Sequence, residues 1–248
     1  MQERNVNIET RDGEMDTFIT HPDGGGPFPA VLIYMDAPGI REELYDLARR
    51  VGTVGYYVMV PDLYYRAGRE RFTPGDMDEA RLAHRNSIRP NNGQVVSDTE
   101  GVLGFIDRGI IDNGEPVRPG PMGAIGYCMS GAFVFCAAGT WPDRFKATSA
   151  MYGTRMVTDG EDSPHLLADK LQGELYCGFA QNDIHVPQSD VDQLTEIMKG
   201  CGVTSLIEQH PGTEHAFQFP GRGAAYHKEA AERGWERMFA MFQRQLKP

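Results

Sequence analysis

The sequence predicts an α/β protein with a mainly parallel central sheet and helices on both of its faces. Short apolar segments alternate with helix-like segments along most of the chain, and Gly- and Pro-rich turns separate them. The segment 30–35 is apolar at every position, which is typical of a parallel strand buried on both faces. Strands and helices that alternate with short connections form such a covered sheet.

Two antiparallel strands are expected at the start of the chain. Residues 6–10 and 15–20 flank Asp12-Gly13, a dipeptide typical of hairpin turns. The glycine-rich stretch 24–27 follows as a loop, and it lacks the Gly-Lys-Ser/Thr ending of a phosphate-binding loop. The chain therefore begins with a hairpin and not with a nucleotide-binding turn.

The later elements are predicted from the spacing of apolar residues. A helix at 41–53 is indicated by Leu44, Leu47, Ala48 and Val51, which recur at intervals of three and four. The expected order is strand 30–35, helix 41–53, strand 56–60, helix 95–111, strand 124–127, helix 129–139, strands 147–151 and 175–180, helix 191–198, strand 205–209 and helix 224–246.

Composition excludes several classes of protein. The chain has 248 residues, of which 24 are basic and 35 acidic, and its net charge is −11. This argues against nucleic acid as a partner, because phosphate binding depends on clustered Lys and Arg. The longest apolar run is far shorter than the ~20 residues that cross a membrane. Residues 1–17 are charged and lack the apolar section of a secretory signal, so we expect a cytoplasmic protein without a membrane segment.

Residues 65–94 interrupt the alternation of strands and helices. Six arginines and four acidic residues give this segment a local charge of +2. The arginines are Arg66, Arg69, Arg71, Arg81, Arg85 and Arg89, and the acids are Glu70, Asp76, Asp78 and Glu79. Two interpretations stay open: a solvated insertion, or a cap over a pocket whose guanidinium groups bind an anionic substrate. We expect residues 1–248 to form one domain that carries this segment as an insertion.

The strongest chemical signal is the stretch from Gly126 to Gly131, Gly-Tyr-Cys-Met-Ser-Gly, between an expected strand and an expected helix. A strand-to-helix turn that presents a nucleophile is strained and requires small residues two positions before and after it. Gly126 and Ser130 meet this requirement around Cys128. The helix dipole favours the thiolate of a cysteine at a helix N-terminus, which makes Cys128 the candidate nucleophile.

Other interpretations of the cysteines stay open. Cys128 is alternatively a buried structural thiol, and Ser130 is a rival nucleophile, although Cys128 occupies the position where Ser130 would need a glycine. Cys136, Cys177 and Cys201 lie in apolar segments or at a helix end, as structural cysteines do. No CxxC pair occurs and the histidines lack ligand spacing. We expect reduced thiols, no metal and no cofactor.

A cysteine nucleophile needs a base within hydrogen-bond reach and a group that orients the base. Asp183 follows the expected strand 175–180, and His215 follows the next strand. Both residues should therefore lie at the carboxyl edge of the parallel sheet, where such sheets bind ligands. His215 is the candidate base and Asp183 its orienting acid. The alternatives are a turn role for Asp183 and a solvent-facing role for His215, and His185 is expected to be a loop histidine.

These motifs together resemble the dienelactone hydrolase family of α/β-hydrolases over nearly the whole chain. The resemblance is carried by Pro61-Asp62-Leu63-Tyr64, Gly126-Tyr127-Cys128, Gln181-Asn182-Asp183 and His215-Ala216-Phe217. It implies an α/β-hydrolase fold in which Cys128 is the nucleophile, His215 the base and Asp183 its orienting acid.

The resemblance implies further roles near the nucleophile. Asp36, directly after segment 30–35, would contact the resting thiol, and the backbone N–H groups of Ala37 and Met129 would form the oxyanion hole. Two departures from the family pattern are small. Ser130 stands where the family usually has Gly, and Asp36 where it usually has Glu.

A larger departure concerns the substrate. Family members that hydrolyse dienelactone bind its carboxylate with an arginine four residues after the histidine, where this chain has Phe219. Arg222 is nearby in the sequence, and Arg81 or Arg85 lies about where a second carboxylate-binding arginine is expected. We expect these four residues and Tyr64 at the substrate site.

The expected reaction is hydrolysis of a small carboxylic ester or lactone through a cysteine acyl-enzyme, as the resemblance to carboxymethylenebutenolidases implies. Phe219 favours an alternative, an esterase or thioesterase for an uncharged substrate. A third possibility is a homologue that binds a small molecule without catalysis. A thiol redox role lacks a resolving cysteine in evident reach. We expect a monomer or a small homo-oligomer.

Overall fold

The structure is a computed structural model that describes residues 1–73 and 77–247. It contains two compact units, Met1–Gly120 and Pro121–Pro248, which are described in turn. That the chain forms one domain stays a prediction. None of the described helices combines the length and the apolar character that a membrane-spanning segment requires.

The strands of the first unit are ordered β1-β2-β4-β3. They are β1 (Gln2–Thr10), β2 (Gly13–His21), β3 (Ala30–Tyr34) and β4 (Tyr57–Pro61). The predicted hairpin is confirmed, since β1 and β2 pair antiparallel from Gln2–His21 to Thr10–Gly13. β2 also pairs antiparallel with β4, whereas β3 and β4 are parallel. Every residue of β3 and β4 is buried, as their apolar runs predict.

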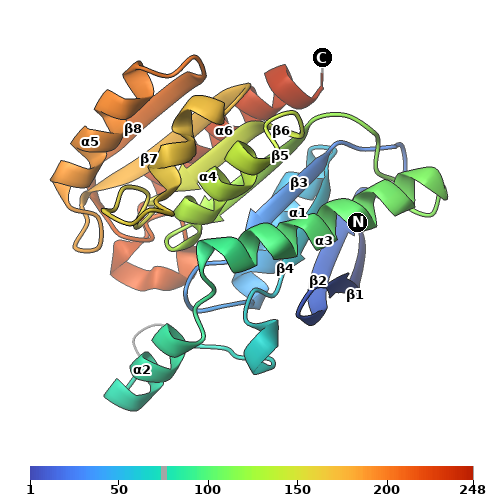
Figure 1. The fold of residues 1–248 in the computed structure, drawn as a ribbon, viewed down its shortest axis with the longest axis horizontal. Coiled ribbons are helices and arrows are strands. Elements are labelled where there is room, and N and C mark those ends of the chain that lie inside the picture. The colour runs from blue at the N-terminus through green and yellow to red at the C-terminus, as the bar shows by residue number, and fades with distance from the viewer. Residues whose placement is uncertain (74–76, 248) are drawn as a thin grey trace. The chain divides into compact units, whose positions relative to one another are not determined.

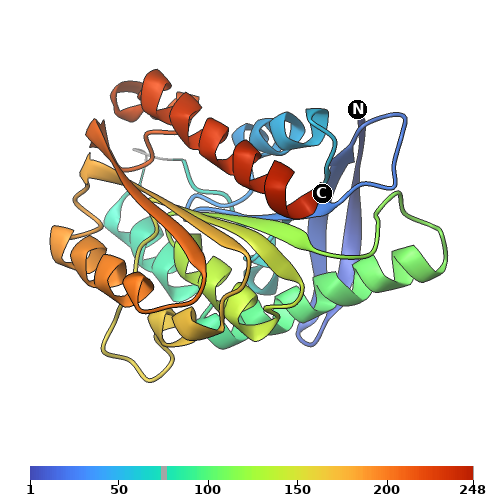
Figure 2. The same ribbon diagram turned by 90° about the horizontal axis from the view of Figure 1, so that it is seen from above.

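Two long helices accompany these strands. α1 (Glu42–Thr53) and α3 (Asn92–Ile111) lie on opposite faces of the strands of their unit (Figure 2). The buried face of α1 carries the predicted residues Leu44, Leu47, Ala48 and Val51. α3 begins before the predicted position because Asn91 and Gln94 form a capping box, which satisfies backbone N–H groups at the helix start.

The arginine-rich segment 65–94 contains a 3-10 turn, η1 (Tyr65–Ala67), and a helix, α2 (Glu79–Ser87). Residues 74–76 of this segment, which include Asp76, lie outside the described residues. No residue of α2 is buried, and α2 extends away from the strands of its unit (Figure 1). The helix itself is therefore solvated, and its role as a cap stays a prediction.

The strands of the second unit are parallel and ordered β5-β6-β7-β8. They are β5 (Met122–Tyr127), β6 (Phe145–Met151), β7 (Glu174–Asn182) and β8 (Thr204–Glu214). β7 and β8 are longer than predicted because their pairing continues past the apolar residues to Asn182–Glu214. Antiparallel pairing is limited to β2 and its two neighbours among the described strands, which confirms the mainly parallel α/β class.

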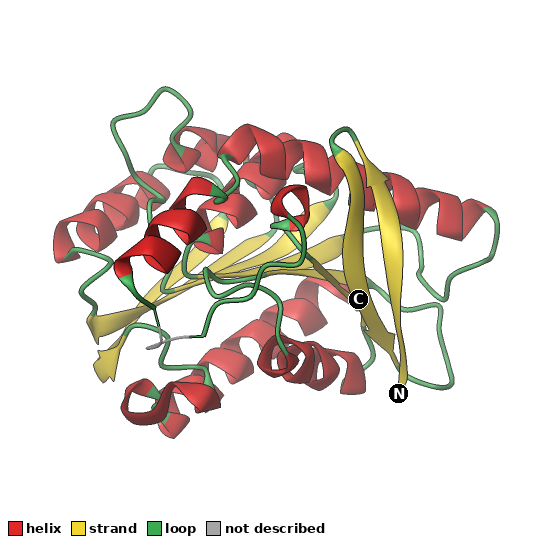
Figure 3. Ribbon diagram, turned by 90° about the horizontal axis from the view of Figure 1, so that it is seen from below, coloured by secondary structure: helices red, strands yellow, loops and turns green. Residues whose placement is uncertain are grey.

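Helices cover both faces of this second set of strands (Figures 2 and 3). α4 (Ser130–Thr140) and α5 (Gln188–Lys199) lie on one face and α6 (Lys228–Leu246) on the other. Two 3-10 segments, η2 (Pro164–Lys170) and η3 (Pro220–Ala225), complete the unit. All but the last residue of α4 are buried, as its small apolar residues predict.

The last helix begins later than predicted. The residues from 220 to 225 form the 3-10 segment, which is interrupted at Gly223 by a left-handed φ of 57°. The His227 side chain then accepts a hydrogen bond from the Ala230 N–H and caps α6. A composition that suits a helix does not reveal this break, because the break depends on the path of the preceding loop.

Candidate active site

Cys128 lies on a sharp turn between β5 and α4. Its φ is +55°, a left-handed value that residues other than glycine rarely adopt. Gly126 leaves no room for a side chain, because a Cβ there would lie within 2.6 Å of both the Ser130 carbonyl carbon and Val134 Cγ2. The turn therefore requires glycine at position 126 and presents a partly exposed Cys128 at the carboxyl end of β5.

The backbone of Cys128 is hydrogen-bonded on both sides to residues at the end of β6. Its N–H donates to the Met151 carbonyl at 3.1 Å, and its carbonyl accepts from the Thr154 N–H at 2.9 Å. The same carbonyl accepts from the Gly131 N–H at 3.1 Å. The strained turn is thus held by the neighbouring strand as well as by its own helix.

Asp183 and His215 follow β7 and β8 and lie in contact. His215 Nδ1 is 2.8 Å from Asp183 Oδ2 and 3.0 Å from Oδ1. Asp183 Oδ1 also accepts a hydrogen bond from the His185 N–H at 2.9 Å. The Asp183 side chain is 1% exposed and that of His215 14%. Because the carboxylate engages Nδ1, Nε2 is the ring nitrogen that can take part in proton transfer.

Cys128 and Asp183 both influence the pKa of His215. Burial lowers the pKa of His215, whereas the hydrogen bonds and charges of Asp183 and Cys128 raise it, with a net rise to about 9. Nε2 is buried and makes no hydrogen bond of ordinary geometry within the described part of the chain. The sulfur therefore lies near the imidazole without an aligned N–H···S bond. An imidazolium beside a thiol is suited to nucleophilic catalysis.

Two rings that the sequence analysis did not assign to the site pack against His215. The ring centroid of Tyr152 lies 5.0 Å from that of His215, and the centroid of His185 lies 4.7 Å away. His185 is exposed on the loop after Asp183, as a loop histidine should be, whereas Tyr152 is fully buried. The one sequence signal for Tyr152 is its place directly after a parallel strand, where ligand sites gather.

Three further predicted site residues lie in the second unit. Met129 is buried and immediately precedes α4. Phe219 is fully buried, with its ring centroid 5.0 Å from that of Tyr127. The Arg222 guanidinium carbon lies over the Phe219 ring, 5.7 Å from its centroid. The assignment of these residues to the oxyanion hole or the substrate site stays a prediction.

In the first unit, Asp36 and Ala37 follow β3. The Asp36 side chain is 1% exposed and binds both terminal nitrogens of Arg41, with 3.1 Å between Nη2 and Oδ2. Arg41, the residue before α1, is not among the site residues predicted from the sequence. Tyr64 donates its hydroxyl hydrogen to the Ala37 carbonyl at 2.8 Å. Three predicted site residues are thus gathered near the end of β3, and their contact with Cys128 stays a prediction.

Five of the six arginines of segment 65–94 fall into two groups. Three form ion pairs: Arg66 with Asp98 and Asp12, Arg69 with Asp16 and Arg71 with Asp62. Arg81 and Arg85 form none with any carboxylate of the described residues. Arg81 donates to the Arg71 carbonyl at 3.3 Å, and Arg85 Nη1 lies 3.7 Å from Met77 Sδ. The two arginines that the sequence analysis selected are therefore not neutralised by a described acidic neighbour.

The other cysteines behave as structural residues. Burial raises the pKa of Cys136 to about 12 and also raises the pKa of the Cys177 and Cys201 thiols. None of the four cysteines forms a disulfide. Within residues 1–73 and 77–247, no group of three or more His, Cys, Asp or Glu side chains is placed to hold a metal ion.

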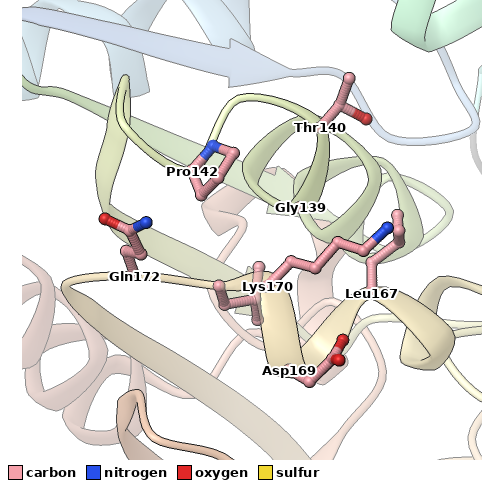
Figure 4. A pocket seen from close by; sticks show the side chains of 8 residues that line it. Gly139, Thr140, Pro142, Leu167, Asp169, Lys170 and Gln172 are labelled. Atoms are coloured by element: carbon pink, nitrogen blue, oxygen red, sulfur yellow. The ribbon is translucent and has the colours of Figure 1, made fainter.

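A pocket of about 650 Å³ lies at the end of α4 remote from Cys128 (Figure 4). Its lining includes Gly139 in α4 and Asp169 and Lys170 in η2. Because an α-helix rises ~1.5 Å per residue, Gly139 is roughly 15 Å along the helix from Cys128. This pocket is separate from the candidate active site.

Comparisons with known proteins indicate the family of this chain. The model of the dienelactone hydrolase family matches residues 15–246. A Synechocystis protein named "Putative carboxymethylenebutenolidase" is 27% identical over 98% of this chain and 96% of its own. A carboxymethylenebutenolidase from Rhodococcus opacus is 24% identical over 89% of this chain and 83% of its own.

A solved structure supports the same assignment. A Klebsiella pneumoniae protein described as a "Putative Dienelactone Hydrolase" superposes with a TM-score of 0.84 at 26% identity, covering 97% of this chain and 98% of its own. The family match and the structural match both extend over almost the entire chain. The protein therefore belongs to the dienelactone hydrolase family, whose members are hydrolases with the α/β-hydrolase fold.

Proposed function

We propose that this protein hydrolyses carboxylic esters or lactones through an acyl-enzyme on Cys128. The observation that carries the proposal is the contact of His215 Nδ1 with Asp183 at 2.8 Å, together with the interaction of the Cys128 side chain with the same imidazole, which raises its pKa. A nucleophile, a base and an orienting carboxylate in this sequence of contacts form a catalytic triad. The left-handed backbone of Cys128 supports the same role, because nucleophiles on strand-to-helix turns are strained.

Acylation begins when the Cys128 thiolate attacks the carbonyl carbon. A C–S bond forms, and an electron pair moves to the carbonyl oxygen. The Met129 N–H at the start of α4 stabilises this oxyanion, helped by the helix dipole, and the Ala37 N–H is the second donor that the family resemblance predicts. As the intermediate collapses, the C–O bond to the leaving alkoxide breaks. His215 then gives its Nε2 proton to the alkoxide, which leaves a thioester and a neutral imidazole.

In deacylation, His215 accepts a proton, whereas in acylation it donates one. Neutral His215 removes a proton from a water molecule, and the hydroxide attacks the thioester carbonyl carbon. The C–S bond breaks when this second intermediate collapses, which releases the carboxylic acid and the thiolate. The imidazolium and the thiolate that began the cycle are then restored. Asp183 keeps Nδ1 protonated throughout, so that Nε2 always faces the reacting atoms.

An anionic substrate is supported by Arg81 and Arg85. Neither guanidinium group is paired with a carboxylate of the described residues, and guanidinium groups bind carboxylates with two parallel hydrogen bonds. The names of the Synechocystis and Rhodococcus relatives support a lactone. We infer that the substrate is a small lactone or ester that carries a carboxylate.

An uncharged ester or thioester is the second candidate substrate. Phe219 favours it, because this position carries a fully buried aromatic ring instead of a cation. The two candidates differ in one measurable property. Only the anionic substrate should lose affinity when Arg81 or Arg85 is replaced.

The variant Cys128→Ala tests the proposal. We expect hydrolysis of a small activated ester to fall at least about 10³-fold, because the nucleophile is lost, while the circular dichroism spectrum is unchanged. Incubation of the wild-type enzyme with a slowly hydrolysed ester should add one acyl group to the peptide that contains Cys128, as measured by mass spectrometry.

Cys201→Ala is the matched control, because Cys201 is also partly exposed and reduced but lies outside the candidate active site. It should retain wild-type turnover. Undiminished hydrolysis by Cys128→Ala would refute the proposal.

A further inference from the structure

The segment Met151–Thr154, directly after β6, contacts both the nucleophile and the base of the proposed triad. We propose that Tyr152 is a positioning residue that keeps the His215 ring aimed at Cys128. The inference rests on the proposed function and adds to it a residue that does not itself touch the reacting atoms. Two independent sets of contacts carry it, one through the backbone and one through the ring.

The backbone contacts bracket Cys128. Met151 accepts from the N–H of Cys128 and Thr154 donates to its carbonyl, so the chain must turn sharply between these two residues. Tyr152 lies inside this turn with φ +40°, and its N–H donates to the Gly178 carbonyl at 2.6 Å. A bulky residue with a left-handed backbone is a conformational outlier. The two hydrogen bonds to Cys128 explain why the outlier is maintained.

The ring contacts restrain His215. The Tyr152 ring meets the His215 ring edge-to-face at 64° and the Phe217 ring at 69°, with centroids 5.0 and 5.4 Å apart. Tyr152 is fully buried, so its ring is a fixed wall. Asp183 fixes one atom of the imidazole, Nδ1, and a single contact of this kind still allows the ring to tilt. The Tyr152 ring supplies a further restraint, and it is fully buried, whereas His185, whose ring also packs on His215, is exposed.

The presence of tyrosine at position 152 indicates that its aromatic ring has a role. A left-handed position favours glycine, which has no Cβ to clash with the backbone, or asparagine, whose short polar side chain can form local hydrogen bonds. Tyrosine here retains a large ring at an unfavourable backbone position, and strain of this kind gathers where a site needs a fixed geometry. Misplacement of a catalytic group by about 1 Å can reduce a rate ~100-fold. A ring that prevents such misplacement affects turnover without binding substrate.

Three variants separate the ring from the backbone. Tyr152→Phe keeps the ring. Tyr152→Asn and Tyr152→Gly remove the ring but suit a left-handed backbone. Tyr152→Gly replaces Tyr152→Asn in the test if the asparagine variant does not fold. We expect kcat for a small neutral ester to fall about 100-fold in the ringless variants, with KM changed less than about threefold. Tyr152→Phe should retain kcat within about threefold.

Alkylation of Cys128 provides a readout that does not depend on turnover. Iodoacetamide reacts with thiolates, and at about pH 6 an ordinary cysteine is protonated. The ringless variants should therefore alkylate more slowly at Cys128 than the wild type and Tyr152→Phe, by about tenfold, because a tilted imidazolium no longer supports the thiolate. Peptide mass spectrometry distinguishes Cys128 from the other cysteines.

The outcomes separate this inference from the proposed function. Wild-type kcat and alkylation in folded Tyr152→Asn or Tyr152→Gly, together with an inactive Cys128→Ala, would overturn the role of Tyr152 and leave the hydrolase proposal standing. A Tyr152→Phe variant as slow as the ringless ones would also overturn it, since the ring would not be the restraint. Activity in Cys128→Ala would instead remove the proposed function.

Discussion

The turn at Cys128 and the helix α2 represent opposite ways of holding functional side chains. At the turn, the residues on both sides of Cys128 are buried, and its backbone N–H and carbonyl are both hydrogen-bonded. On α2 no residue is buried, and Arg81 and Arg85 have no ion-pair partner in the described part of the chain. The first region is fixed by packing. The helix α2 is attached to residues 70–72 through partly exposed contacts, among them the His84–Glu70 ion pair at 3.1 Å.

This difference reflects the physics of the two tasks. A thiolate reacts only when it and its base are fixed at short distances, so the nucleophile needs a packed turn. Attraction between a guanidinium and an anion falls off slowly with distance, so a cation can select substrates from an exposed helix. We therefore expect changes near Cys128 to affect kcat or stability, and changes on α2 to affect KM for charged substrates.

The largest effect is expected from Asp183→Asn. The amide cannot hold Nδ1 protonated in the same way, so Nε2 would often carry the proton in the neutral ring. We expect kcat for a small ester to fall by about 10³ to 10⁴, with a smaller change in KM, in steady-state kinetics. Asp192→Asn, an exposed change on α5, is the control and should behave as wild type. Equal kcat values in the two variants would contradict the triad.

Gly126→Ala tests the packed turn itself. A Cβ at this position collides with the Ser130 backbone and Val134, so either β5 or α4 must move. We expect a loss of about 3 kcal/mol or more in the free energy of unfolding, measured with urea.

Gly202→Ala is the matched control in the same unit, because a Cβ there meets nothing within 4 Å. Its unfolding free energy should stay within about 0.5 kcal/mol of wild type. If Gly126→Ala were as stable as Gly202→Ala, the turn would be less tightly packed than the structure indicates.

The pH dependence tests the electrostatics of the same region. The pKa of His215 is raised to about 9, so the imidazolium persists below that pH and is lost above it. An alkyl ester needs the imidazolium to protonate its poor leaving group, and kcat/KM should therefore fall as the pH rises through about 9.

Asp183→Asn should move this alkaline limb to lower pH, because the hydrogen bond from His215 to Asp183 raises the pKa. Residual activity of the variant on the alkyl ester, followed across the pH range, provides the measurement. If the alkaline limb of the variant moved to higher pH, Asp183 would lower the pKa of His215 and not raise it, which would contradict the assignment.

The smallest effect is expected on α2. Arg81→Ala or Arg85→Ala should raise KM for an ester that carries a carboxylate by about tenfold, equivalent to one charge-assisted hydrogen bond of ~1.4 kcal/mol. KM for a neutral aryl acetate should be unchanged.

Arg69→Ala is the control for this charge effect, because Arg69 is exposed but already paired with Asp16. It should leave both KM values as in the wild type. If Arg69→Ala and Arg81→Ala raised KM for the anionic ester equally, general charge and not a specific arginine would be responsible. No effect from either α2 variant would favour the uncharged substrate that Phe219 suggests.

Local patterns explain why much of the fold and the candidate site could be predicted. The turn at Cys128 requires small residues at 126 and 130, and this requirement acts over a few positions of the chain. Asp183 and His215 were found because parallel strands place their carboxyl ends on one edge. The observed hydrogen bond between them agrees with that reasoning.

Contacts between residues distant in the sequence were beyond such patterns. The ion pair of Asp36 with Arg41 and the packing of Tyr152 on His215 depend on how side chains are oriented after folding. The choice of which arginines in segment 65–94 are neutralised depends on acids such as Asp16 and Asp98, which come from other elements. These distances between side chains cannot be predicted from the spacing of residues along the chain.

The sequence by itself determined the α/β class and the hairpin at the start, because hydrophobic periodicity and tight turns are local constraints. It also indicated the three residues of the proposed triad, whose roles stay a prediction. Only the tertiary structure decided the left-handed backbone at Tyr152, the partner of each arginine and the environment that raises the pKa of His215. The physical reason is that burial, ring packing and charge pairing arise between segments, and they exist only after distant parts of the chain have come together.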